Sequence, residues 1–162
     1  MREEPSQQID RRAIRVWQLN GVVTTLVFAI ITATLYIVKG QYNWPDFVSY
    51  ITYGLAALTS IYLLVAIFVV PYIKWRRWRY QIYPHEIYVQ RGLIIITRTV
   101  VPISRVQHVD TEQGPFLRAF KLSTVSVSTA ATTHQIPALP VEEAEQLRDD
   151  IARLAGVDDD DE

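Results

Sequence analysis

Two long segments without a charged side chain dominate the first half of the sequence. The first covers residues 16–38 and the second covers residues 47–73, and charged residues bound each of them on both sides. An α-helix rises 1.5 Å per residue, so about 20 apolar residues cross the roughly 30 Å hydrocarbon core of a bilayer. Both segments exceed that length, and the pattern predicts a transmembrane hairpin over residues 16–73.

Two other interpretations of these segments fit less well. A pair of buried core helices would have to be covered on all sides, which a chain of 162 residues can hardly achieve. A cleaved signal peptide has an apolar stretch of only about 7–15 residues and is not followed at once by a second span. We therefore expect both segments to be membrane anchors.

Basic residues are concentrated on the outer flanks of the predicted hairpin. The connecting loop, residues 39–46, contains one lysine, whereas four basic residues precede the first segment and four follow the second: Arg2, Arg11, Arg12 and Arg15; Lys74, Arg76, Arg77 and Arg79. Because positively charged flanks stay on the cytoplasmic side, we expect a multi-pass protein with both termini in the cytoplasm.

The composition of the two segments bears on their role. Neither contains Asp, Glu, Lys, Arg or His, the groups that ion pathways usually need within the membrane, so we expect neither a transporter nor a channel. Small residues recur at four-residue spacing on one face of each segment: Thr25, Ala29 and Ala33; Thr52, Ala56 and Ser60. Such faces let helices approach closely, either within the hairpin or in a dimerisation face.

After residue 79 the period of the pattern changes from helix to strand. Short alternating or β-branched runs predict strands over residues 80–82, 87–89, 93–101, 105–111, 124–129 and 134–139. In the fifth run we expect Val125 and Val127 to face inward and Ser126 and Ser128 to face outward. Antiparallel strands of this length indicate a small β-sandwich or partly open barrel.

One amphipathic helix is predicted to close the chain. Pro140 is favourable in a first turn, and Gly156 is suited to end a helix. Between them an apolar stripe is expected to cover one end of the strands: Val141, Ala144, Leu147, Ile151 and Leu154. The fold class is thus an α+β membrane protein, in which the hairpin precedes a β domain with a C-terminal capping helix.

Charge divides the chain in the same place. The net charge of −1 combines nine Lys/Arg against four Asp/Glu in residues 1–79 with seven against thirteen in residues 80–162, and there is no cysteine. The absence of cysteine excludes disulfides, thiol nucleophiles and iron–sulfur clusters. We expect five parts: an N-terminal segment (1–15), the hairpin (16–73), a basic juxtamembrane linker (74–79), the β domain (80–156) and an acidic tail (157–162).

Several motifs carry a resemblance to a known family. They are Arg79-Tyr80, Gly92, the block Val101-Pro-Ile-Ser-Arg-Val-Gln-His-Val-Asp-Thr-Glu-Gln-Gly-Pro115, Leu117-Arg118, Ser123-Thr-Val125, Ser128-Thr-Ala130, Ile136-Pro-Ala-Leu139 and Leu147-Arg148. The sequence resembles bacterial pleckstrin-homology-like (PH-like) membrane proteins of the YdbS-like group over about residues 10–155. The resemblance implies a bent β-sandwich with a C-terminal helix and a location in the bacterial cell membrane. It brings no catalytic residues, and it implies that members are often encoded beside a larger membrane protein with repeated domains of this kind.

The densest polar cluster in the second half is a block around the fourth predicted strand: Arg105, Gln107, His108, Asp110, Gln113 and Arg118. In an extended segment His108 and Asp110 lie on one face and could pair. A serine in a nucleophile elbow and a histidine pair with metal-ligand spacing are both missing from the sequence. The block is interpreted as structural or as an interaction surface, with catalysis the weakest alternative; no catalytic residue, metal or cofactor is assigned.

The junction after the second span is both basic and aromatic: Lys74, Trp75, Arg76, Arg77, Trp78 and Arg79. It is a stop-transfer anchor and a candidate for contacts with lipid headgroups, since basic residues are attracted to an anionic leaflet. Phosphoinositide binding is not expected, because the first hairpin turn, Pro84-His85-Glu86, lacks a basic residue. Residues 80–139 hold five basic and three acidic residues, which is far from the basic surface expected of a nucleic-acid-binding protein.

Two functions remain open from the sequence. The first is a non-enzymatic membrane-anchored module that assembles with itself, as a homo-oligomer, or with a paralogous multi-domain membrane protein. The second is an inner-leaflet lipid or ligand sensor, with membrane lipids as partners in either case. The natural ligand and the biological process are not encoded in any recognisable motif.

Overall fold

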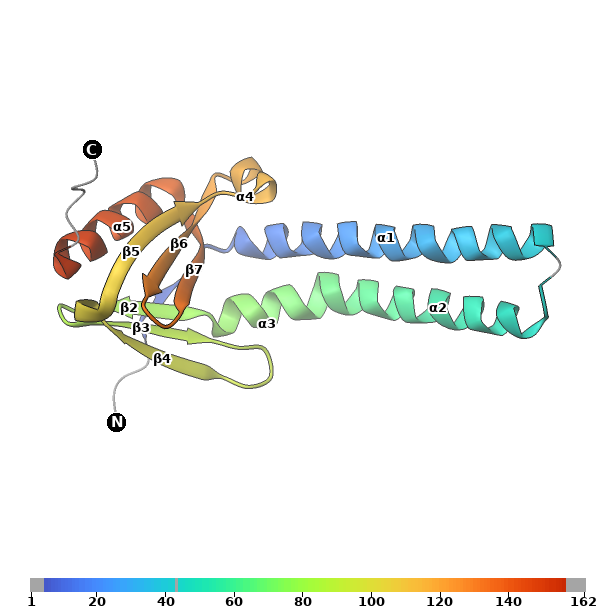
Figure 1. Ribbon diagram of the computed structural model, residues 1–162, viewed down its shortest axis with the longest axis horizontal. Coiled ribbons are helices and arrows are strands. Elements are labelled where there is room, and N and C mark those ends of the chain that lie inside the picture. The colour runs from blue at the N-terminus through green and yellow to red at the C-terminus, as the bar shows by residue number, and fades with distance from the viewer. Residues whose placement is uncertain (1–4, 43, 157–162) are drawn as a thin grey trace. The chain divides into compact units, whose positions relative to one another are not determined.

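The structure is a computed structural model that describes residues 5–42 and 44–156; the predicted acidic tail, residues 157–162, lies outside the described residues. The chain divides into two compact units. One unit holds residues 17–72, and the other combines residues 5–16 with residues 73–156. The architecture is α+β, with two long apolar helices ahead of antiparallel sheets and a C-terminal helix, as predicted (Figure 1).

The helical unit is built from two long helices. The first is α1 (Ala13–Tyr42), and the second runs without a break through α2 (Phe47–Leu64), a π-helical stretch (Val65–Val69) and α3 (Val70–Arg77). Both are long and apolar enough to cross a membrane, over Ala13–Tyr42 and Phe47–Arg77. The predicted spans therefore coincide with continuous helices, which extend a few residues beyond the uncharged segments.

Pro71 lies in the second helix just after the π-helical stretch. A proline has no N–H to donate, so the carbonyl of Ile67, four residues earlier, loses its usual helical partner. The side-chain amide of Gln18 in α1 donates to that Ile67 oxygen at 3.0 Å. The helix thus continues past Pro71, and a polar contact between the two helices satisfies the carbonyl that the proline leaves free.

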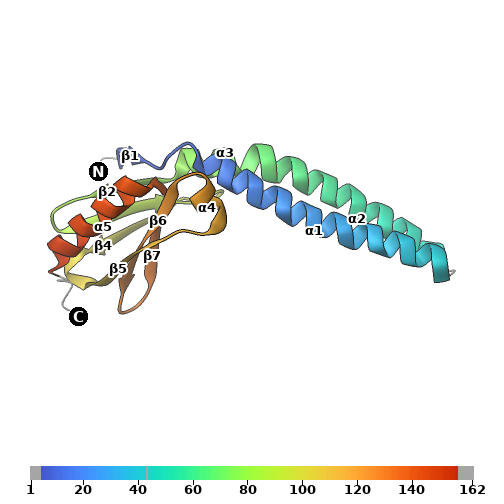
Figure 2. The same ribbon diagram turned by 90° about the horizontal axis from the view of Figure 1, so that it is seen from above.

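Two antiparallel sheets form the other unit (Figures 1 and 2). The first has the order β1-β2-β3-β4 and the second the order β5-β6-β7. Their bounds are β1 Gln7–Gln8, β2 Arg79–Ile82, β3 Glu86–Arg91, β4 Thr97–Pro102, β5 Val106–Glu112, β6 Leu122–Thr129 and β7 Thr133–Pro140. A 3-10 turn, Ile103–Arg105, connects the sheets, and a short helix, α4 (Pro115–Ala119), joins β5 to β6.

The closing helix, α5 (Val141–Ala155), packs against β5, β6 and β7. Its Ala144 and Ile151 are fully buried, and Gly156 ends it in a left-handed conformation with φ of 66°. The predicted apolar stripe is wrong at its end, because the side chain of Leu154 is 45% exposed. Leu154 lies in the last turn of α5, near the Gly156 that ends the helix.

The expected third strand, residues 93–101, is wrong in its first half. Strand β4 begins at Thr97, and residues 93–96 form the turn between β3 and β4. Their β-branched composition favours a strand, but Gly92 has a φ of 144°, which turns the chain back on itself before the run begins. The sequence pattern records side-chain preference and does not show where this glycine reverses the chain.

Ser126 also departs from its predicted exposure, since it is buried together with Val125 and Val127. Strand β6 lies between β5 and β7, and Ser126 stands opposite Asp110 on one neighbour and Gln135 on the other. Cross-strand neighbours on the same face lie close enough for their side chains to touch. The serine is thus buried in the central strand of its sheet, on a face that the alternating pattern alone would leave in water.

The segment before the first span belongs to the β unit. Strand β1 pairs with β2, with Gln7 opposite Tyr80 and Gln8 opposite Arg79. Ile9 and Ala13 are buried, and the Asp10 N–H donates to the Ala138 carbonyl at 3.2 Å. Residues set apart by sequence as an N-terminal segment thus supply an edge strand and two core side chains.

Candidate functional site

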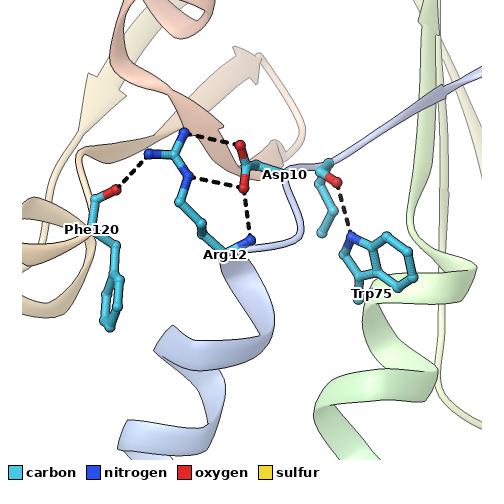
Figure 3. A network of polar contacts seen from close by, with 5 residues as sticks. Asp10, Arg12, Trp75 and Phe120 are labelled. Atoms are coloured by element: carbon cyan, nitrogen blue, oxygen red, sulfur yellow. Dashed lines mark hydrogen bonds and ion pairs between the residues drawn. The ribbon is translucent and has the colours of Figure 1, made fainter.

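Trp75, one of the candidate lipid contacts, is bound within the β unit. Its indole N–H donates to the Ile9 carbonyl at 3.0 Å (Figure 3). Its own carbonyl accepts from the Gln8 side chain at 3.1 Å. The Arg11 guanidinium lies 5.9 Å from the centre of the indole ring, within the range of a cation–π contact. The tryptophan therefore holds the N-terminal segment beside the start of the β domain.

A second contact fixes the same segment through Asp10 and Arg12. The Arg12 guanidinium donates to both Asp10 oxygens, at 3.1 and 3.0 Å, and to the Phe120 carbonyl at 3.1 Å, while the Arg12 N–H reaches Asp10 at 2.7 Å (Figure 3). Burial alone would raise the pKa of Asp10, but the hydrogen bonds and charge of Arg12 outweigh it, and the pKa is lowered. This contact was not predicted from the sequence. Its only signal there is an acidic residue, Asp10, two positions before an arginine, Arg12, at the start of a helix.

The rest of the basic segment divides between solvent and protein. Arg76 is exposed, whereas the Arg77 guanidinium donates to the Leu93 carbonyl and, at 3.3 Å, to the Ile94 carbonyl. The indole nitrogen of Trp78 is buried without a hydrogen-bond partner in the described part of the chain. Arg79 is a residue of β2, and Lys74 is half-buried. The six candidate lipid contacts, residues 74–79, thus extend from the last turn of α3 to the first residue of β2.

The predicted polar block separates into parts. His108 and Asp110 form an exposed pair on β5, with Nε2 and Oδ1 3.0 Å apart, as their shared strand face predicted. The Gln113 amide donates to the Leu122 carbonyl at 2.9 Å and so helps to hold β6. Arg118 lies on α4, exposed. Two members, Arg105 and Gln107, contribute instead to a groove.

That groove, of about 530 Å³, opens beside β4, where the first sheet has a free edge. Its lining comes from β4, the 3-10 turn, the start of β5 and the β6–β7 turn: Val100–Pro102, Ser104–Gln107, Thr129–Thr132 and His134. Burial, together with the positive charge of Arg91, lowers the pKa of His134. The wall is therefore mostly neutral near physiological pH, with Arg105 its cation.

The helical unit has a groove of its own, of about 450 Å³, between α1 and α2. Five of the six small residues with four-residue spacing line this groove. The full lining is Ala29, Thr32, Ala33, Tyr36, Thr52, Tyr53, Ala56, Thr59 and Ser60. The sixth, Thr25, is buried and bonds back to the Gly21 carbonyl at 2.8 Å. A side chain added to Gly21 would meet Ala66 at 3.2 Å, so the helices touch there and leave space farther along.

Two serines of β6 are the polar groups across the strand from the His108–Asp110 pair. Ser126 and Ser128 stand opposite Asp110 and His108 on β6. The Ser128 hydroxyl lies 3.0 Å from that of Thr133, and the Ser126 hydroxyl has no hydrogen-bond partner among the described residues. Across residues 5–42 and 44–156, no three His, Asp or Glu side chains are grouped so that they could hold a metal ion.

Comparison with known proteins places these features in a family. The model of the bacterial PH domain matches residues 18–155. The UPF0699 transmembrane protein YdbS of Bacillus subtilis (strain 168) is 44% identical over 161 residues, which cover 99% of each chain. The UPF0699 transmembrane protein YdbT of the same strain is 32% identical over 102 residues, which cover 60% of this chain and 20% of that protein.

No solved structure matches the chain significantly. The family match nevertheless includes the second long helix, strands β2 to β7 and all of α5, and the relative of similar length matches over 99% of both chains. The resemblance seen in the sequence is thereby confirmed, and the chain belongs to the bacterial PH domain family of membrane proteins, with a YdbS-like layout.

Proposed function

We propose that this chain is a non-enzymatic assembly subunit of the cell membrane, which pairs with a second copy or with a longer membrane protein of its family. The PH-like domain is presented in the cytoplasm, and the hairpin supplies the contact within the bilayer. The observation that carries the proposal is the groove of about 450 Å³ between α1 and α2.

The physical argument concerns what fills that groove in lipid. Ala29, Ala33 and Ala56 line it with small side chains, and the hydroxyls of Thr52 and Ser60 bond back to Val48 and Ala56 carbonyls at 2.8 and 2.9 Å. Helices in a membrane associate by close packing, since lipid tails are as apolar as the helices themselves. A further helix seated in the groove would gain contacts that flexible lipid chains make less well.

The cytoplasmic orientation has two supports. The basic flanks of the hairpin follow the positive-inside rule. In addition, the pairing of β1 with β2 joins the chain before the first span to the chain after the second, so these ends belong to one compartment. Residues 44–46, between the helices, are then on the opposite side.

The choice of partner rests on the two relatives. One strain holds a protein that matches this chain over its full length and a longer one that matches it over 20% of its own length. A short and a long member with related sequence are suited to a mixed complex, in which the longer one supplies a helix to the groove. A homo-oligomer uses the same surface.

The test is crosslinking in native membranes followed by affinity purification of the full-length protein and mass spectrometry. We expect a stoichiometric partner, either the chain itself or the longer family member. Ala56→Leu fills the groove and should reduce the crosslinked product, whereas Ala57→Leu makes the same change beside it and should not. A monomer without a stoichiometric partner, or equal effects of the two variants, would contradict the proposal.

The second candidate, lipid or ligand sensing at the inner leaflet, is favoured by the exposed Arg76 at the end of the second span. A basic residue there is attracted to anionic headgroups by roughly 1 kcal/mol. Arg76→Gln should then lower the amount of phosphatidylglycerol that co-purifies with the full-length protein, and Arg153→Gln on α5 should not. Equal lipid retention in both variants would remove this candidate.

A further inference from the structure

Four consecutive aliphatic side chains are exposed at the turn between β3 and β4. The exposed fractions are 37% for Leu93, 87% for Ile94, 79% for Ile95 and 47% for Ile96. Turns that face water are usually rich in Gly, Asn, Asp, Ser and Pro. The turn between β6 and β7 in the same unit, Ala130–Thr132, has only small side chains, in contrast to residues 93–96.

The backbone of the turn is tightly folded, which fixes where these side chains project. Gly92 has a φ of 144°, and a Cβ placed on it would lie 1.9 Å from the Ile95 carbonyl oxygen. The chain therefore folds back against its own glycine. The side chains of residues 94 and 95 are directed outward from the tip instead of toward the sheet.

Arg77 connects this turn to the end of a membrane span. Its guanidinium donates to the carbonyls of Leu93 and Ile94, and Arg77 is the last residue of the apolar helix Phe47–Arg77. All three residues belong to the β unit. Because a span must leave the bilayer at its basic end, a turn bonded to that end lies at the depth of the headgroups.

Basic residues surround the apolar tip. Arg91 is the last residue of β3, and Arg98 lies in β4 opposite Gln90. The Arg77 guanidinium is bonded to the backbone of the turn itself. Arg91 and Arg98 are both exposed. An apolar tip with a cationic rim matches the boundary between acyl chains and anionic phosphates, where apolar area and charge both contribute to binding.

We propose that the β3–β4 turn, residues 93–96, inserts into the cytoplasmic leaflet and forms a membrane contact separate from the two spans. Ile94 and Ile95 enter the acyl-chain boundary, the exposed Arg91 and Arg98 contact lipid phosphates, and Arg77 holds the turn at the end of the span. The partner is the lipid surface itself. The contact holds one hairpin of the first sheet at the bilayer, whatever the chain assembles with.

The absence of cysteine from the sequence allows a direct test. Ile95→Cys in the full-length protein gives a single thiol, which is labelled with an environment-sensitive fluorophore. The protein is placed, one copy per disc, in nanodiscs of phosphatidylglycerol and phosphatidylcholine, with or without lipids that carry a doxyl quencher near the headgroup. Glu145→Cys, on the exposed face of α5, is the matched control.

We expect the label at position 95 to emit at shorter wavelength in nanodiscs and to lose intensity with the doxyl lipids, while the label at position 145 does neither. Adding Ile94→Asn and Ile96→Asn should diminish the quenching at position 95 without changing thermal unfolding of the protein. The proposal is overturned if the label at position 95 emits at the same wavelength as the label at position 145 and is not quenched by the doxyl lipids. It is also overturned by a blue shift without lipid quenching, which would mean that protein covers the turn.

The outcome is independent of the proposed assembly. The crosslinking test measures association through the groove between α1 and α2. The fluorescence test measures the membrane contact of the β3–β4 turn in discs that hold one copy of the protein. Failure of one leaves the other unaffected.

Discussion

The phenol of Tyr80 donates a hydrogen bond to the Glu143 carboxylate at 2.9 Å. Tyr80 is the second residue of β2 and is 1% exposed, and Glu143 lies in the first turn of α5. The bond joins the strand that leaves the membrane span to the helix that closes the domain. Carboxylates are also favourable in the first turn of a helix, so Glu143 is well placed to accept it.

Tyr80→Phe should lower the free energy of unfolding of the full-length protein by about 1.5 kcal/mol, because it removes a hydrogen bond to a charged acceptor. Urea titration in detergent, followed by near-ultraviolet circular dichroism, measures the difference. Tyr83→Phe, at an exposed tyrosine after β2, is the control and should have little effect. Equal stability of the two variants would show that the Tyr80 bond is not made in solution.

The same tyrosine predicts an alkaline effect. Burial raises the pKa of Tyr80 above its ordinary value of 10.0, and the Glu143 carboxylate raises it further. Above pH 10 the unfolded chain releases this proton and the folded protein keeps it, so the free energy of unfolding falls as pH rises, by up to about 1.4 kcal/mol per pH unit. Between pH 10 and 11 the native protein should lose more stability than Tyr80→Phe does.

Asp10 predicts the opposite dependence at acid pH. Its pKa is lowered in the folded protein from the ordinary value of 3.8, so its contribution is present above about pH 4 and is lost as pH falls. Asp10→Asn should therefore reduce stability at pH 7 and show a weaker loss between pH 5 and 3 than the native protein. Asp149→Asn, at an exposed carboxylate on α5, is the control variant for the loss of one surface carboxylate.

Gly92 and Gly114 form a matched pair for the β3–β4 turn. Gly92→Ala should destabilise the domain by at least about 2 kcal/mol, because it combines a strained φ with a clash against the Ile95 carbonyl. Gly114 has a φ of −74° and open space around its Cα, so Gly114→Ala should change stability by less than about 1 kcal/mol. Thermal unfolding in detergent distinguishes them, and similar midpoints would contradict the tight turn.

The apolar stripe of α5 gives a last prediction. Ile151→Ala should cost about 2–5 kcal/mol, since it leaves a cavity where a fully buried side chain stood. Leu154→Ala removes a half-exposed side chain from the same helix and should cost much less. A large effect at Leu154 in the full-length protein would indicate that a partner or the membrane covers this end of α5.

Local patterns in the sequence were enough to predict the spans, the closing helix and most strands. The length of an uncharged segment is enough to predict a span. Pro140 and Gly156 mark the two ends of α5 through their own backbone preferences. These features need no knowledge of distant residues. The β3–β4 turn was missed because β-branched residues favour strands, while the reversal depends on one glycine and on Arg77.

The candidate residues were predicted less completely, for a related reason. His108 and Asp110 were expected to pair because they are two residues apart on one strand, and their contact is local. The contacts of Trp75 with Ile9, and of Arg12 with Phe120, join residues far apart in the sequence. No periodicity indicates such pairs, since they arise only after the two sheets have formed.

The position of β1 sets an order of events during biosynthesis. Gln7 and Gln8 leave the ribosome before either span, but their partners Tyr80 and Arg79 are made only after both. In the topology proposed above, strand β1 can join its sheet only after the second span has returned the chain to the side of the N-terminus. In that topology a chain that inserted a single span would separate the two halves of the domain, so insertion of the whole hairpin would have to precede the pairing of β1 with β2.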